Sequence, residues 1–293
     1  MFASRGFARA CTLLSLLLVA AAPEAQLPED RVVSDVNWSN GTMRVTVERP
    51  VSAEDAAGPT AIARTQRAIR RDATEIIVSA LVNLPFDSLH TVSGLLEADQ
   101  SRIIQVQEAA ASARATEATA TPDLRVARVS FELDLYADLA SHFVTHERPA
   151  PLEARLGWYA TTDYTGIIVY AGDELPLFGT DRLVELEPTL FPGLYYRQDP
   201  GALLFRIAER EHIDPAELVA RGPAAYTSDV QATGHADRLG TRPLRILAIG
   251  VFGSNPTDVV ISESDAAQIL ASQHNRSLVR DGRVVIVVDP DRL

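Results

Sequence analysis

The sequence predicts an α+β protein of two domains, an N-terminal hairpin plus β-α-β-type sandwich and a mostly β C-terminal domain. Three observations lead to this prediction. Hairpin and helix patterns fill the first half, strand patterns dominate the second half, and residues 145–155 carry prolines but no periodicity. With 293 residues, of which 46% are hydrophobic, the chain is long enough for two ordinary domains or one large one.

The first residues have the pattern of a secretory signal. Arg5 and Arg9 form a short basic head, and an apolar run from Ala10 to Ala22 follows and ends in small residues. That run is too short for a membrane anchor. We therefore expect residues 1–21 to be a signal peptide and the remaining chain to be exported, periplasmic or outer-membrane-associated, with no transmembrane anchor.

The residue types exclude several chemistries from the exported part. The only cysteine, Cys11, lies within the predicted signal, so disulfides, cysteine nucleophiles and cysteine-bound metals are not expected. All 27 basic residues are arginine, which excludes a Walker A lysine and a Schiff-base lysine. A net charge of -12 makes nucleic acid and anionic membrane surfaces poor partners.

The first element of the expected domain over residues 28–144 is a hairpin. Asn40-Gly41 is a two-residue hairpin signal, and pairing across it places Trp38 opposite Met43. One face of this hairpin is then apolar and the other is polar. The sequence therefore predicts a hairpin over roughly residues 32–48.

Helices and strands alternate after the hairpin. Apolar residues at steps of three and four indicate helices, and strict alternation indicates a half-buried strand. The alanine-rich residues 109–123 lose their periodicity, so we expect a loop there. The elements predicted after the hairpin are a helix over about 60–84, a short strand over 88–93, a second helix over about 95–114 and a strand within 128–136.

We expect residues 145–155 to be a linker and residues 156–293 to be a mostly β domain. Its strand patterns occur in DYTGIIVYAG, GLYYRQD, ALLFRI, RPLRILAIGV, TDVVIS and GRVVIVVD, with short helices expected at 215–219 and 265–271. Gly250 to Ser254 resemble the start of a phosphate-binding loop. Because another strand follows instead of a helix, we interpret them as a turn between strands.

No constellation of residues predicts catalysis, a cofactor or a metal. His142 and His146 stand four apart, which is the spacing of two metal ligands on a helix, but the glutamate of the H-E-x-x-H motif is missing and Pro149 interrupts the segment. No G-x-S-x-G elbow is present, and Gly253-Ser254 lies in the predicted turn. We therefore expect no catalytic, cofactor-binding or metal-binding residues.

Aromatic residues in the second half are the candidate contacts for a ligand or partner. Trp158, Tyr195 and Tyr196 belong to a group that could line a glycan-binding groove. Tyr195 and Tyr196 point to opposite faces of a strand, so one of them is expected to be exposed. Ordinary core packing is the alternative, because aromatic residues are frequent in strands whether or not they bind a ligand.

The first half also resembles a known family. Its helix ARTQRAIRRDATEIIVSAL, short strand LHTV, helix SRIIQVQEAAA and alternating strand RVSFELDL, at residues about 60–136, resemble a small bacterial lipoprotein family that includes flagellar outer-ring and basal-disk proteins. The second half is similar to the C-terminal extension of uncharacterised exported relatives of that family. The resemblance implies a protein without enzymatic activity that assembles at the outer membrane or around the flagellar motor.

Three functional hypotheses follow. The first is a non-enzymatic, exported envelope assembly or scaffold protein that forms homo-oligomers and binds envelope or flagellar motor proteins through sheet edges, the flagellar association being what the resemblance implies. The second is a periplasmic glycan-binding module that uses Tyr195, Tyr196 and Trp158. The third is a hydrolase that uses His142 or the acidic residues of the second half, although the sequence supplies no assembled nucleophile, base and orienting group.

Overall fold

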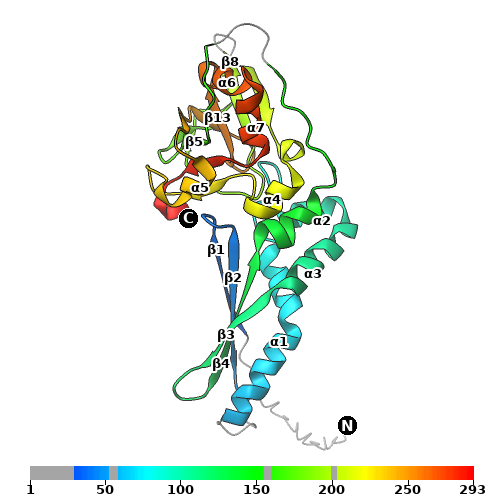
Figure 1. Ribbon diagram of the computed structural model, residues 1–293. Helices are drawn as coiled ribbons and strands as arrows, with labels where there is room; N and C mark the ends of the chain where they lie inside the picture. Colours follow the sequence, from blue (N-terminus) through cyan, green and yellow to red (C-terminus); the bar gives the residue numbers. More distant parts are fainter. Residues whose placement is uncertain (1–29, 53–58, 155–159, 199–202) are drawn as a thin grey trace, which may run out of the picture.

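The computed structural model describes residues 30–52, 59–154, 160–198 and 203–293 (Figure 1). Within them, the chain has the predicted α+β class, with a hairpin sheet and helices in the first half and a mostly stranded second half. The predicted signal peptide at residues 1–21 lies outside the described residues. Among the residues that are described, no helix is long and apolar enough to span a membrane.

The first half is an antiparallel sheet with helices packed on one face, as expected. Its elements are β1 (Arg31–Asn37), β2 (Thr42–Pro50), α1 (Pro59–Leu81), α2 (Val92–Ala98), α3 (Ile103–Ser112), β3 (Arg114–Ala120) and β4 (Val126–Asp134). The strands lie in the order β1-β2-β4-β3. Val45 and Phe131 are buried on the face that α1 covers, whereas Arg44 and Glu132 form an ion pair of 3.0 Å on the polar face.

The hairpin is confirmed, but its predicted register is wrong. Val36, and not Trp38, lies opposite Met43, so the turn is longer than two residues. Trp38 leaves the strand and packs edge-on against Tyr226 of the second half, with ring centroids 6.0 Å apart. The difference is a shift of two residues, which leaves each side chain on its predicted face because strand side chains alternate with period two.

The alanine-rich residues 109–123 do not form the predicted loop. They end α3 and then form β3, which pairs with β4 with a register shift between Ala115 and Glu117. Alanine is depleted in strands, so the pattern of this segment does not indicate one. Pairing with the strongly alternating β4 decides its conformation.

The helices of the first half differ in detail from the prediction. α1 ends at Leu81, three residues before its predicted end. The predicted strand over 88–93 is absent, because Thr91 is the N-cap of α2. The predicted helix over 95–114 is interrupted, because the Asp99 carboxylate accepts a backbone N–H and starts a separate turn before α3.

Within the described residues, the second half contains two four-stranded sheets and one two-stranded antiparallel sheet, β6-β7. One four-stranded sheet is parallel, in the order β10-β14-β5-β11, and the other is mixed, in the order β12-β13-β8-β9. The strands are β5 (Ile167–Tyr170), β6 (Leu175–Pro176), β7 (Leu183–Val184), β8 (Leu194–Gln198), β9 (Leu203–Ala208), β10 (Ala225–Thr227), β11 (Leu244–Leu247), β12 (Gly250–Phe252), β13 (Asp258–Ser262) and β14 (Val284–Val287). The helices are α4 (Pro215–Arg221), α5 (Ala236–Leu239), α6 (Glu263–Leu270) and α7 (Gln273–Arg280).

The two helices predicted in the second half are present, and their caps explain where they begin. Asp214 precedes Pro215 and caps α4 by accepting two backbone N–H groups. Ser262 caps α6 by accepting the N–H of Asp265 at 3.1 Å. Helix α7 was not predicted, since it is short and carries few apolar residues.

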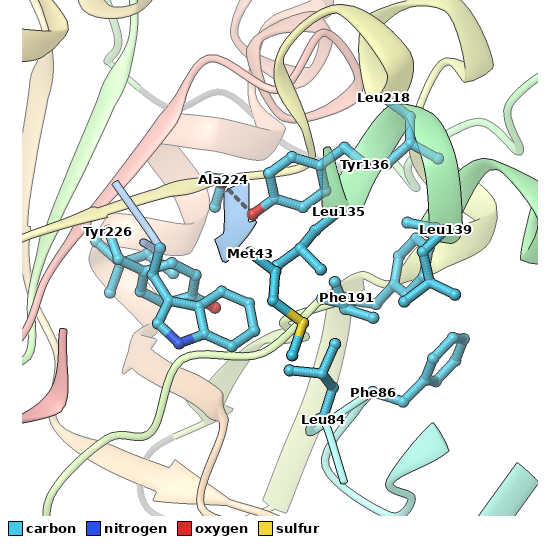
Figure 2. Packing of buried hydrophobic residues seen from close by; sticks show 14 of the residues in the cluster. Met43, Leu84, Phe86, Leu135, Tyr136, Leu139, Phe191, Leu218, Ala224 and Tyr226 are labelled. Carbon is cyan, nitrogen blue, oxygen red and sulfur yellow. Dashed lines mark hydrogen bonds between the residues drawn. The ribbon is translucent and has the colours of Figure 1, made fainter. Parts of the chain in front are cut away.

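The two halves share one hydrophobic core, part of which Figure 2 shows. Tyr136 of the first half reaches into the second half, where its hydroxyl donates to the carbonyl of Ala224 at 3.2 Å. Phe86 packs against Phe191 with ring centroids 5.0 Å apart, and the N–H of Phe191 donates to the Phe86 carbonyl at 3.0 Å. The segment around Phe86 therefore joins the halves through both side chains and backbone.

Candidate functional site

The residues predicted as ligand contacts do not form one surface. Tyr195 packs against Phe252 with ring centroids 5.1 Å apart, whereas Tyr196 stacks on Phe205 at 5.2 Å. Both tyrosines are half-buried, so the prediction that one is exposed is wrong. Trp158 lies outside the described residues. The β8 backbone separates the two tyrosines, and Tyr195 lines a cavity.

That cavity, of about 130 Å³, lies where the two halves meet. Residues 87–89 of the first half form one side, and the second half supplies the rest. We call it the junction cavity and define it by the side chains that carry its chemistry. These are Ser88, Tyr195, Glu209, Arg210, Phe252 and Asp258.

Asp258 is the most deeply buried of these groups, at 2% exposure. Its carboxylate accepts the Gly193 N–H at 2.7 Å and a hydrogen bond from the Ser88 hydroxyl. Burial is the main cause that raises the pKa of Asp258 to about 6, and these two hydrogen bonds oppose it. No arginine or histidine among the described residues forms an ion pair with this carboxylate.

Sheet register places Asp258 beside Gly193. β13 and β8 are parallel, with Val259 opposite Leu194, so the residues just before them also lie side by side. A Cβ at Gly193 would lie 2.7 Å from the Asp258 carboxylate. A side chain there would therefore displace the carboxylate, and glycine leaves room for it.

The turn after β12 brings Ser88 to the cavity. The Asn255 N–H donates to the Ser88 carbonyl at 2.9 Å, and the Asn255 amide donates to the Asp87 carbonyl at 3.2 Å. A Cβ at Gly253, where φ is +113°, would lie 2.3 Å from Ser88 Cβ. The prediction of a turn between strands is confirmed for Gly253 and Ser254 but is wrong for Gly250–Phe252, which form β12 and pair with β13. The close approach to the first half explains why glycine occupies position 253.

Glu209 is fully engaged by its neighbours. One carboxylate oxygen accepts the Tyr195 hydroxyl, and the other accepts Arg206 Nη1 at 2.8 Å. Arg206 also lies 3.4 Å from Glu211. Burial, followed by Glu209, raises the pKa of Tyr195 above its ordinary value, so the phenol remains a hydrogen-bond donor.

Arg210 is the only cation lining the junction cavity within the described residues. Its guanidinium lies over the rings of Phe86 and Phe191, at 5.2 and 5.7 Å from their centroids. Its Nη1 is buried and has no hydrogen-bond partner among the described residues. Its guanidinium therefore packs on aromatic rings, and no carboxylate of the described residues pairs with its charge.

A second, smaller cavity of about 50 Å³ adjoins the junction cavity. The two share Phe191, Gly193, Glu209 and Arg210. Its remaining lining is mainly apolar and comes from both sheets of the second half, including Val169 of β5. We call it the apolar cavity. It places an apolar wall next to the charged groups.

The two histidines with metal-like spacing are separated by their partners. His142 lies 3.9 Å from Glu108, and His146 Nε2 is 2.9 Å from the Ile213 carbonyl oxygen. Within the described ranges, no group of three or more histidine, cysteine or acidic residues could hold a metal ion.

Sequence reasoning missed Asp258 and Arg210. Asp258 carries one signal, since it is an acid at the start of the apolar strand pattern TDVVIS. Arg210 lies in AEREH, which resembles any solvated charged stretch. Its importance depends on Phe86, which is distant in sequence.

Taken together, the fold and the cavity define a two-domain α+β protein with a charged pocket at the domain junction. Residues 30–142 match the family model described as Treponema pallidum Tp0624, N-terminal domain. Residues 166–290 match the family model described as Treponema pallidum Tp0624, second domain. The chain is thus similar to two successive domains of that protein, in the same order. No curated protein matches the chain. Neither family description mentions flagella, so the flagellar resemblance stays a prediction.

Proposed function

We propose that the chain is a non-enzymatic, exported binding protein of the cell envelope and that the junction cavity is its ligand site. The observation that carries this proposal is the buried Asp258 carboxylate, which lines a cavity without a cationic partner among the described residues. A buried charge without a partner destabilises a folded protein. Such groups are concentrated at functional sites, where a ligand supplies the missing partner.

Binding is better supported than catalysis. A general acid–base pair needs two groups that can reach the substrate and exchange protons. Both oxygens of Glu209 accept hydrogen bonds, from Tyr195 and Arg206. Among the described residues that line the cavity, Asp258 is the most deeply buried acid and has no cationic partner, which suits recognition of a fixed ligand.

Thermal unfolding with small-molecule probes tests this proposal. We expect at least one probe among amines, amino acids, sugars and carboxylates to raise the Tm of the wild type, because a ligand that binds only the folded state stabilises it. The gain should disappear in Asp258→Asn and persist in Asp181→Asn, which changes an exposed acid outside the cavity. If every probe that raises Tm acts equally on both variants, the junction cavity is not the ligand site.

A second function, envelope assembly, is favoured by the free edge of β1. This strand lies at the edge of its sheet, and within the described residues no strand pairs with its outer side. Val32 and Val33 are 40% and 47% exposed. An exposed edge strand is a template for pairing with another strand. We propose that β1 pairs with β1 of a second copy, as in a symmetric dimer.

Sedimentation equilibrium tests the assembly proposal. The wild type should form dimers, and Val33→Lys should shift the equilibrium towards monomers because a charge on an edge strand opposes pairing. Val230→Lys is the matched control, since Val230 is also exposed but lies outside the sheets. A wild type that stays monomeric at high concentration, or a dimer unaffected by Val33→Lys, would contradict the proposal. Envelope or flagellar motor partners would be sought by pull-down from fractionated cells.

A further inference from the structure

We infer that the ligand of the junction cavity is a small α-amino acid with an apolar side chain, bound through its carboxylate to Arg210 and through its ammonium to Asp258. This inference rests on the proposed binding function and names the class of ligand. It follows from the charges that remain unpaired in the cavity, and from the apolar space beside them.

Most charged groups that line the junction cavity already have partners. Glu209 and Glu211 both lie within ion-pair distance of Arg206, at 2.8 and 3.4 Å. Asp87 Oδ1 accepts the backbone N–H groups of Leu89 and His90 at 2.9 and 2.8 Å. Asp87 Oδ1 also lies 3.0 Å from His90 Nδ1, and the Asp87 side chain is 29% exposed, so water solvates its charge, whereas Asp258 is buried.

Two opposite charges remain for a ligand. The Arg210 guanidinium has an unpartnered, buried Nη1 and is held by aromatic rings. Among the described residues, the Asp258 carboxylate is bonded to the neutral donors Gly193 N–H and Ser88 hydroxyl and to no cation. A guanidinium recognises a carboxylate, and a carboxylate recognises an ammonium group. A ligand that carries both groups would satisfy both residues, whereas a ligand with one charge would leave the other residue unpaired.

The space in the two cavities limits the size and polarity of this ligand. At about 130 Å³, the junction cavity is smaller than a typical drug-sized pocket of roughly 300 Å³ or more, so the charged part of the ligand has few heavy atoms. The adjoining apolar cavity of about 50 Å³ shares Arg210 and Phe191 with it. An apolar side chain of a few carbon atoms is what this second space accommodates. Alanine and valine combine both features.

Isothermal titration calorimetry with matched probes tests the inference. L-Valine carries both charges, isobutyrate lacks the ammonium group, and isobutylamine lacks the carboxylate. We expect valine to bind and each single-charge probe to bind at least about tenfold more weakly, since a charged group left without its partner is costly. Arg210→Gln and Asp258→Asn should each weaken valine binding by about tenfold or more.

Control variants and the probe pattern separate the possible failures. Arg182→Gln and Asp181→Asn remove exposed charges outside the cavity and should leave valine binding unchanged. Circular dichroism of each variant checks that it is folded.

Binding of a sugar or of a simple amine that depends on Asp258, without binding of any amino acid, would overturn this inference and leave the proposed function standing. If none of the probes binds at the cavity, both fail. Valine binding that both cavity variants retain would also overturn the inference.

Discussion

Replacing Asp258 by Asn is expected to make the protein more stable at neutral pH. Burial raises the pKa of this carboxyl from 3.8 to about 6 in the folded protein, so the folded state holds the proton more tightly than the unfolded chain does. A pKa of about 6 in place of 3.8 corresponds to about 3 kcal/mol of unfolding free energy. The structure thus carries this destabilisation whenever the carboxyl is ionised.

The direction of the pH dependence follows from the same pKa. Below pH 3.8, Asp258 is protonated in both the folded and the unfolded state, so it does not lower the free energy of unfolding. As the pH rises from 3.8 to about 6, the unfolded chain releases its proton first, so the free energy of unfolding falls. Above pH 6 the full effect is present. Asparagine has no charge and keeps an oxygen that accepts the Gly193 N–H, so the variant avoids this loss.

Urea unfolding of the wild type and Asp258→Asn at several pH values measures the effect. The variant should be more stable by up to about 3 kcal/mol at pH 7.5, and the difference should shrink towards zero near pH 4. Asp181→Asn serves as the control and should change the free energy by less than about 0.5 kcal/mol. A variant that is less stable than the wild type at pH 7.5, or a difference that does not vary with pH, would refute the reasoning.

Further predictions concern the joint between the halves and one buried arginine, all measured by urea unfolding. Gly222→Ala should destabilise by about 2–4 kcal/mol, because φ is +73° there and the added Cβ would lie 2.4 Å from the Tyr136 ring; a neutral effect would show that this contact relaxes freely. Tyr136→Phe should cost only about 1 kcal/mol, the value of one hydrogen bond to the Ala224 carbonyl, and a much larger loss would point to a role beyond that bond. Arg238→Met should cost about 3 kcal/mol or more, because the buried guanidinium donates to three backbone carbonyls that would lose their partner. An unchanged midpoint for Arg238→Met would mean that water replaces those bonds.

Local patterns were sufficient for most elements of the first half. The alternation in RVSFELDLY correctly predicts the inward side chains of β4, with Val129 and Leu133 at 0% and 2% exposure. Ser130, on the predicted outward face, is an exception: it is 5% exposed and lies 3.0 Å from the Thr46 hydroxyl of β2. The apolar spacing correctly predicts α1, whose Ile69 and Ile77 are buried. These patterns depend on the geometry of a single strand or helix, so no knowledge of distant residues is needed.

Segments that depend on a distant partner were predicted poorly. β3 is a strand because β4 lies beside it, although its own residues do not favour one. The hairpin register differs from the prediction because Trp38 packs against Tyr226, a residue of the other half. In both cases tertiary contacts outweigh the local preference.

The sequence by itself therefore determined the α+β class, the two-part organisation and the buried faces of the long elements, since these follow from hydrophobic periodicity along the chain. Only the tertiary structure decided the candidate site. Asp258 meets Gly193 through the parallel register of β13 and β8, and Ser88 arrives through the turn that contains Asn255. Local sequence patterns do not predict which strands pair with each other. Strand pairing depends on how the apolar faces of both halves are buried in one core.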